Sequence, residues 1–197
     1  MPLLEDYQLI DLTEKYKDYI LHWRNSDHVR AHMFTDRLIT QEEHDLWFER
    51  AKNDNGLING IIAKVLLYQS QPIGFVHFTH LDKEQRRCSW GFYVGEKSAP
   101  KGSGQIMAML SLNMIFEEFH LRKLCSEVLA CNDRSLRYHQ RLGFVEEGRL
   151  KEHLFRKDHY EDVILMALFR EQWIARQQEL LQEWKNNGTW GDKIIEG

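Results

Sequence analysis

Hydrophobic and polar positions change period several times along the chain, and each change marks a predicted element. Runs rich in β-branched and aromatic residues predict strands at residues 7–12, 60–68, 73–81, 88–94, 123–130, 144–149 and 159–168. The second and third runs are separated by Gln69-Ser70-Gln71-Pro72, which predicts a hairpin. The run at 88–94 then continues this hairpin into a three-stranded meander.

Helical spacing of apolar residues occupies most of the intervals between these runs. It predicts helices at residues 16–25, 27–32, 104–119, 135–142 and 171–184, and another that begins at Thr40. Thr40 and Glu43 form a capping-box pattern ahead of Leu46 and Trp47. These elements predict an α+β fold, whose sheet is mostly antiparallel.

One strand–helix–strand crossover, residues 88–130, interrupts the antiparallel order, so its two strands are expected to be parallel neighbours. Only three prolines and no glycine- or serine-rich linker are present. We therefore expect one domain at residues 1–170, followed by a C-terminal helix and loose tail at 171–197. This helix either covers the sheet or packs against a second subunit in a homodimer, and both alternatives remain open.

Composition and charge narrow the class of protein. Of the 197 residues, 43% are hydrophobic and 28% charged, and the net charge of −4 argues against a nucleic-acid binder. No window approaches the roughly 18 apolar residues of a membrane span, so a cytoplasmic protein without a membrane partner is expected. Cys88, Cys125 and Cys131 show no CxxC spacing, which predicts buried reduced thiols and no metal site.

A glycine loop carries the strongest chemical signal. The strand at 88–94 leads into Gly102 and Gly104, where a long helix begins. Glycine lets the backbone approach an anion closely, and the first N–H groups of a helix lack intrahelical partners. The loop lacks the GK[ST] ending of a P-loop and the third glycine of a dinucleotide fingerprint. Alone, it predicts either a phosphate site or simply a tight turn.

The downstream sequence decides between these alternatives. Glu127-Val128-Leu129-Ala130-Cys131-Asn132, then Asn132-Asp133-Arg134-Ser135 and Arg141-Leu142-Gly143-Phe144, resemble the GCN5-related N-acetyltransferase (GNAT) family. The resemblance implies the GNAT fold and acetyl-CoA as co-substrate. It assigns acetyl-CoA binding to Phe92, Tyr93, Val94, Lys101, Gly102, Ser103, Gly104, Gln105, Asn132 and Ser135. Ala99 replaces a customary Gln or Arg, so Lys101 and the backbone N–H groups from 101 to 106 are expected to bind the pyrophosphate.

The same resemblance implies direct transfer of the acetyl group to a primary amine, without an acyl-enzyme. His139 stands where many members have a tyrosine acid, and Tyr138 lies beside it. Either side chain can protonate the leaving thiolate, and an unperturbed histidine would be partly charged at working pH. Glu127 is the candidate base. The alternatives are a surface His139 with an inward Tyr138, and a Glu127 that is an ordinary strand carboxylate.

The N-terminal third resembles the nucleotide-sugar branch of the family, which acetylates UDP-4-amino-4,6-dideoxy-N-acetyl-β-L-altrosamine on the route to pseudaminic acid. The matching segments are Trp23–Asp27, Val29-Arg30, Met33–Asp36, Glu42–His44 and Trp47. This branch implies a substrate site lined by Trp23, Arg30, His44, Trp47, Thr79, His80 and Tyr93. Alternatively, Trp23 and Trp47 are core residues of amphipathic helices, and Arg30 is a solvated head on a packed stem.

Two further functions stay open. In the first, the acceptor is the N-terminus of a ribosomal protein or a polyamine. A polyamine site should be lined with carboxylates, and Glu42, Glu43 and Asp45 could supply them. These three also fit the acidic first turn of a helix. The other possibility is a non-catalytic acetyl-CoA-binding module, suggested by the departures at Ala99 and His139.

Overall fold

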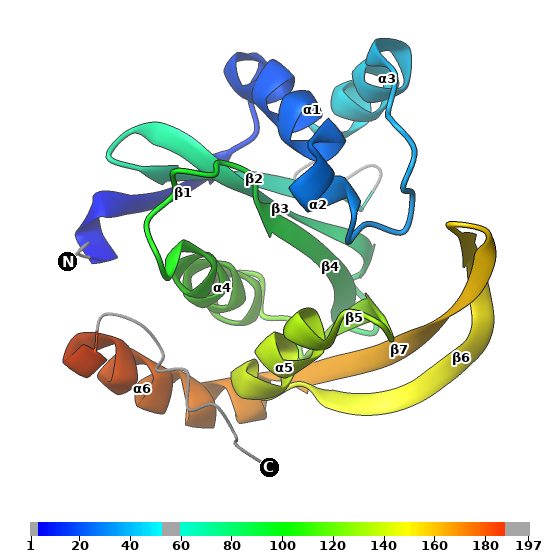
Figure 1. Ribbon diagram of the computed structural model, residues 1–197. Coiled ribbons are helices and arrows are strands. Elements are labelled where there is room, and N and C mark those ends of the chain that lie inside the picture. The colour runs from blue at the N-terminus through cyan, green and yellow to red at the C-terminus, as the bar shows by residue number, and fades with distance from the viewer. Residues whose placement is uncertain (1–3, 53–59, 188–197) are drawn as a thin grey trace.

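The computed structural model describes residues 4–52 and 60–187 and contains a seven-stranded mixed sheet with helices on both faces (Figure 1). The strand order is β1-β2-β3-β4-β5-β7-β6, and every pair is antiparallel except β4 and β5. The strands are β1 Tyr7–Asp11, β2 Ile62–Tyr68, β3 Gln71–Asp82, β4 Arg87–Val94, β5 Lys123–Leu129, β6 Val145–Arg156 and β7 His159–Phe169. The predicted fold class and the parallel crossover are therefore confirmed.

Six α-helices connect or flank these strands within the described residues. They are α1 Lys17–Asn25, α2 Asp27–Arg30, α3 Gln41–Ala51, α4 Ser103–Asn113, α5 Asp133–Leu142 and α6 Arg170–Asn187. Short 3₁₀ turns precede β1 and α1, and a π-helical segment, Met114–Glu118, extends α4. The predicted capping box at Thr40 and Glu43 is present at the start of α3.

The β2–β3 turn is tighter than the sequence predicted. Only Gln69 and Ser70 lie in the turn, with φ of 46° and 64°, and the strand resumes at Gln71. Two consecutive positive φ angles suit the right-handed twist of a two-residue hairpin. Pro72 lies within β3 beside a register shift at Leu66 and Leu67, an irregularity that accommodates its missing N–H donor.

β6 is twice as long as predicted, extending to Arg156 rather than ending at Arg149. Its residues are mostly exposed, so the alternation that identifies a half-buried strand is weak. The β6–β7 hairpin curves away from the sheet toward α2 (Figure 1). There the buried Arg156 donates to the carbonyl of Ala31 at 3.1 Å. This bond joins the end of β6 to the residue that follows α2.

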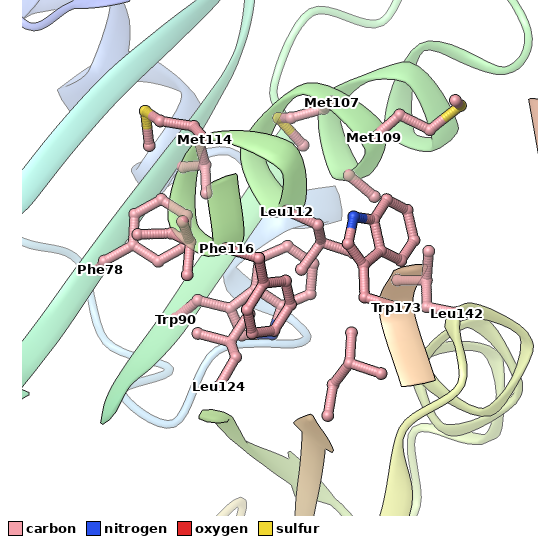
Figure 2. Packing of buried hydrophobic residues seen from close by; sticks show 14 of the residues in the cluster. Phe78, Trp90, Met107, Met109, Leu112, Met114, Phe116, Leu124, Leu142 and Trp173 are labelled. Atoms are coloured by element: carbon pink, nitrogen blue, oxygen red, sulfur yellow. The ribbon is translucent and has the colours of Figure 1, made fainter. Parts of the chain in front are cut away.

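The larger hydrophobic core lies between the sheet and α4, α5 and α6. Figure 2 shows Trp90 and Leu124 of the sheet together with Leu112, Phe116 and Trp173 in this cluster. A second cluster lies on the other face, beneath α1 and α3, and includes Phe48 and Phe75. The two faces of β4 consequently have different environments.

The C-terminal helix α6 belongs to the larger core. Trp173, Leu180 and Trp184 are buried, and Trp173 Nε1 donates to Asn113 Oδ1 at 2.9 Å. The sequence left open whether this helix covers the sheet or packs against a second subunit, and its apolar residues pack within the chain. Of the predicted loose tail, Asn186 and Asn187 belong to α6, and residues 188–197 lie outside the described part. No helix among residues 4–52 and 60–187 is long and apolar enough to cross a bilayer.

Candidate active site

β4 and β5 separate shortly after they meet. Their parallel register covers only Arg87–Ser89 against Lys123–Cys125, whereas β4 stays paired to β3 as far as Val94. The edge of β4 from Trp90 to Val94 thus has no strand partner on the β5 side. Unpaired strand edges bind extended molecules through main-chain hydrogen bonds. The residues predicted to contact the co-substrate in β4, Phe92, Tyr93 and Val94, lie along this edge.

The glycine loop follows directly at the end of β4. Gly102 caps α4 with φ of 89°, a left-handed conformation that favours glycine. An ideal Cβ on Gly102 would lie 2.5 Å from the Trp184 ring, so α6 also requires a glycine there. Gly102 therefore adopts the left-handed conformation that the loop needs and leaves space for the Trp184 ring of α6.

Not all the N–H groups from 101 to 106 are free for the expected binding of a pyrophosphate. Ser103 N–H donates to the Pro100 carbonyl, and the N–H groups of Gln105 and Ile106 donate to the Gly102 carbonyl. In the described residues, the N–H groups of Gly102 and Gly104 make no hydrogen bond. These two donors and the exposed Lys101 remain the groups of the loop best suited to hold an anion.

The Ser103 side chain points into the protein rather than toward the loop surface. Its hydroxyl is 2.7 Å from the Pro100 carbonyl and 3.2 Å from Tyr7 Oη, and the residue is only 2% exposed. Ser103 therefore stabilises the loop from within, which corrects its predicted role as a direct ligand.

α5 begins on the other side of the gap between β4 and β5. Asn132 caps this helix, and its side-chain oxygen accepts the Ser135 N–H at 3.1 Å. Tyr138 reaches across to the first turn of α4 and donates to the Gly104 carbonyl at 2.6 Å. Its ring centroid is 5.3 Å from that of Phe92 on the free edge of β4. The structure thus brings Tyr138, Phe92 and Gly104 together.

His139 is a core residue, 2% exposed. Its Nδ1 lies 2.7 Å from the Ser135 carbonyl and its Nε2 lies 2.9 Å from Ser126 Oγ. A carbonyl only accepts, so Nδ1 carries the proton and Nε2 accepts from the serine. Burial lowers the pKa of His139 to about 4, which makes the imidazole neutral at working pH. The expectation of a partly charged His139 was therefore wrong, as was the alternative of a surface position.

Glu127 lies on the face of β5 opposite α5 and is exposed. It borders a pocket of about 930 Å³ whose lining includes Ser89, Cys125, His80 and Glu84. No ion pair of Glu127 occurs within the described residues. The carboxylate is thus available to a positively charged molecule in the pocket.

The predicted nucleotide-sugar residues do not converge on one site. Trp23 and His44 are 2% and 4% exposed, and Trp47 packs against the same core cluster. His44 Nε2 bonds to the Lys17 carbonyl at 2.9 Å, and the Tyr93 hydroxyl lies against the Ile20 carbonyl beneath α1. These side chains hold α1 and α3 on the sheet, a correction of the role expected for them as substrate ligands.

The remaining acceptor-site predictions lie apart from this cluster. Arg30 bonds to Asp27 Oδ1 at 2.6 Å and to the Asp36 carbonyl at 3.0 Å. Thr79 and His80 lie near the far end of β3, where His80 lines the pocket beside Glu127. Of these three residues, Thr79 and His80 lie on β3, and His80 lines the pocket.

His77 is a residue of this face that the sequence analysis did not select. It lies on β3 opposite Gly91, and its ring extends over that glycine. The signal was present in the alternation of Phe75, His77 and Thr79 along one face of a predicted strand. The sequence could not show that Gly91 lies opposite His77, because this requires the pairing of β3 with β4.

The three cysteines differ in environment. Cys88 is buried, Cys125 half-buried and Cys131 exposed, so the expectation of three buried thiols fails for Cys131. Burial raises the pKa of all three thiols, most strongly at Cys88. A raised pKa keeps a thiol protonated and weakly nucleophilic.

Comparison with known proteins agrees with this geometry. The acetyltransferase (GNAT) domain model matches residues 8–145. The chain is 26% identical over 116 residues to the putative ribosomal N-acetyltransferase YdaF of Bacillus subtilis (strain 168), covering 59% of this chain and 63% of that protein. It is 21% identical over 160 residues to the spermidine N(1)-acetyltransferase of Vibrio cholerae, covering 81% of this chain and 91% of that one.

A solved structure has the same fold. The spermidine N-acetyltransferase from Vibrio cholerae, in complex with CoA and spermine, superposes with a TM-score of 0.78 at 20% identity. The superposition covers 86% of this chain and 99% of that chain. The family model spans well over half of the sequence, and the split between β4 and β5 beside a glycine loop occurs in the matched part. The chain therefore belongs to the GNAT acetyltransferase family.

Proposed function

We propose that this protein is an acetyl-CoA-dependent N-acetyltransferase that transfers the acetyl group directly to a cationic primary amine. The observation that supports this most is the free edge of β4 between Trp90 and Val94. It leads from the parting of β4 and β5 to the N-terminus of α4. An extended molecule with a phosphate at one end and a thioester at the other fits this path.

In this proposal, the pantetheine arm lies along the free edge of β4 and the pyrophosphate lies at the glycine loop. The N–H groups of Gly102 and Gly104 and the ammonium of Lys101 bind the phosphates. The Asn132 amide nitrogen, whose oxygen already caps α5, remains a donor on the β5 side of the gap. Gln105 and Ser135 border the same space from α4 and α5.

Tyr138 is the better candidate for the general acid. Burial raises the pKa of its hydroxyl, which keeps the O–H protonated until a thiolate forms beside it. His139 has both ring nitrogens engaged and a low pKa, so it instead positions the helix that carries Tyr138. Protonated thiols argue against an acyl-enzyme on a cysteine and favour direct transfer.

The charge of the pocket favours a cationic acceptor. The pocket is lined by three carboxylates, Asp82, Glu84 and Glu127, against two cations, Lys83 and Arg87, and this negative balance favours an ammonium group over the diphosphate of a nucleotide sugar. Cationic amines are also the acceptors after which the Vibrio cholerae spermidine N(1)-acetyltransferase and the putative Bacillus subtilis ribosomal N-acetyltransferase are named. The nucleotide-sugar acceptor stays a competing prediction, weakened because Trp23 and His44 are buried and the half-buried Tyr93 packs against the same cluster.

An acceptor panel tests both parts of the proposal. Purified protein is mixed with acetyl-CoA and, separately, spermidine, a peptide with a free N-terminus and the UDP-linked amino sugar, and released thiol is measured. We expect the highest kcat/KM with spermidine or the peptide, and a Glu127→Gln variant that loses affinity for these cations. Preference for the UDP-sugar would contradict the cationic acceptor. Binding of acetyl-CoA without transfer to any amine would favour a non-catalytic module.

A further inference from the structure

His77 occupies the middle of the sheet where β4 loses its β5 neighbour. The β3–β4 register places it opposite Gly91, and its ring lies on the same face as Phe75, at a centroid distance of 5.5 Å. An ideal Cβ on Gly91 would lie 2.5 Å from His77 Nε2. The missing side chain at Gly91 thus makes room for an imidazole that extends from β3 over the backbone of β4.

The hydrogen bonding of His77 differs from that of the other histidines packed inside the protein. His44 and His139 both bond through ring nitrogens to main-chain carbonyls. Among the described residues, His77 Nδ1 is buried without a partner, and no hydrogen bond of Nε2 occurs. A buried polar group without a partner costs folding free energy and calls for an explanation.

Burial lowers the pKa of His77 to about 4, although part of the side chain remains exposed. The imidazole is consequently neutral throughout the physiological range, with an unshared electron pair on one ring nitrogen. No ion pair or hydrogen bond in the described residues competes for that electron pair. A neutral imidazole in this state can accept a proton.

Glu127 lies on the same face of the sheet as His77. Ser89 pairs with Cys125, and two residues further along each strand are Gly91 and Glu127, on the same face. The His77 ring lies over Gly91 of β4, so the imidazole and the Glu127 carboxylate lie on the same face of the sheet, beyond the last paired residues of β4 and β5. An ammonium group bound on this face by Glu127 is on the side of the sheet that carries His77.

We propose that His77 is a catalytic base that accepts the proton of the acceptor amine during acetyl transfer. This inference rests on the proposed function. The acceptor ammonium first gives one proton to water, because a nitrogen without a lone pair cannot attack. The neutral amine nitrogen then attacks the thioester carbon, a C–N bond forms, and the C–S bond breaks with its electron pair on sulfur. The proton released from nitrogen passes to His77 Nε2, and the Tyr138 hydroxyl gives its proton to sulfur. Glu127, the base expected from the sequence, here attracts and orients the ammonium.

Two substitutions at one position test this role. His77→Ala removes the base and leaves a cavity, and His77→Gln keeps a hydrogen-bonding side chain of similar size that cannot take the proton. Base catalysis contributes roughly 10²–10⁴-fold, so we expect kcat to fall about 100-fold in both, with the KM for acetyl-CoA nearly unchanged. His120→Asn, a change at an exposed histidine with a φ of 52°, is the matched control and should retain wild-type kcat.

Added imidazole separates catalysis from structure. It should restore part of the kcat of His77→Ala, because the free base enters the vacated space, and leave His77→Gln unchanged. Wild-type kcat in His77→Gln, or no imidazole rescue of a folded His77→Ala, would overturn the role of His77 while leaving the acetyltransferase proposal intact. A wild-type protein that transfers to no amine would overturn both.

Discussion

Tyr138 and His139 are adjacent in sequence but have opposite environments. The Tyr138 hydroxyl points to the first turn of α4, whereas the His139 side chain lies in the core and bonds to Ser126 and Ser135. Helical geometry sends consecutive side chains in different directions, and the sequence alone could not tell which one faces the gap. We therefore expect Tyr138, and not His139, to meet the leaving thiolate.

Removing the Tyr138 hydroxyl should slow transfer without weakening co-substrate binding. For Tyr138→Phe we expect kcat to fall roughly 100-fold, the lower end of general-acid effects, with a small change in the KM for acetyl-CoA. Thiol release under saturating acceptor measures both constants. Tyr19→Phe, at a tyrosine that is 45% exposed on α1, is the control. Equal kcat in Tyr138→Phe and wild type would exclude Tyr138 as the acid.

His139 should make stability fall on acidification. Its folded pKa of about 4 lies below the ordinary value of 6.5, because burial disfavours the charged ring. Above pH 6.5 both states are neutral there, and below it only the unfolded chain takes up the proton. The free energy of unfolding should therefore lose about 2 kcal/mol from this group between pH 7 and pH 5.

Urea unfolding of the wild type and His139→Gln at both pH values measures this contribution. The variant is less stable at pH 7, since it loses packing and hydrogen bonds, but its stability should decline less with acid. His77 and the carboxylates titrate alike in the two proteins. Parallel pH dependence would show that His139 is not the group responsible.

α6 links the C-terminal part of the chain to the glycine loop. Trp184 is 3% exposed and its ring packs over Gly102, the cap of α4. The amphipathic pattern predicted this helix, but not what it covers, because its charged residues also suit an exposed surface or a partner. Its contact with the loop depends on a tertiary arrangement that local periodicity does not encode.

Truncating Trp184 should destabilise the protein through this contact. Trp184→Ala is expected to lower the free energy of unfolding by about 3 kcal/mol, as for other large-to-small changes in a core. Ile174→Ala, in the same helix at 40% exposure, should cost less than about 1 kcal/mol. Similar losses in the two variants, measured by denaturant unfolding, would mean that α6 is not anchored through Trp184.

The molecule as a whole follows from its sequence more closely than the acceptor site does. Runs of β-branched and aromatic residues predicted all seven strands, and the capping box predicted the start of α3. The strand–helix–strand crossover predicted the parallel pair, because all of these patterns can be recognised in short stretches of sequence. The proposed donor site could be selected from the sequence, since Gly102 and Gly104 lie in one loop. The proposed acceptor site could not, because Trp23 and His44 are the same kinds of residue in a core as in a ligand site, and only burial distinguishes them.

In the proposed function, acetyl-CoA lies along the free edge of β4 with its pyrophosphate at the start of α4. A crystal structure with coenzyme A bound tests it most directly. We predict the pantetheine arm beside Trp90–Val94, the pyrophosphate on the N–H groups of Gly102 and Gly104, and the sulfur within hydrogen-bonding reach of the Tyr138 hydroxyl. Coenzyme A bound away from this edge, or with its sulfur out of reach of Tyr138, would contradict the account.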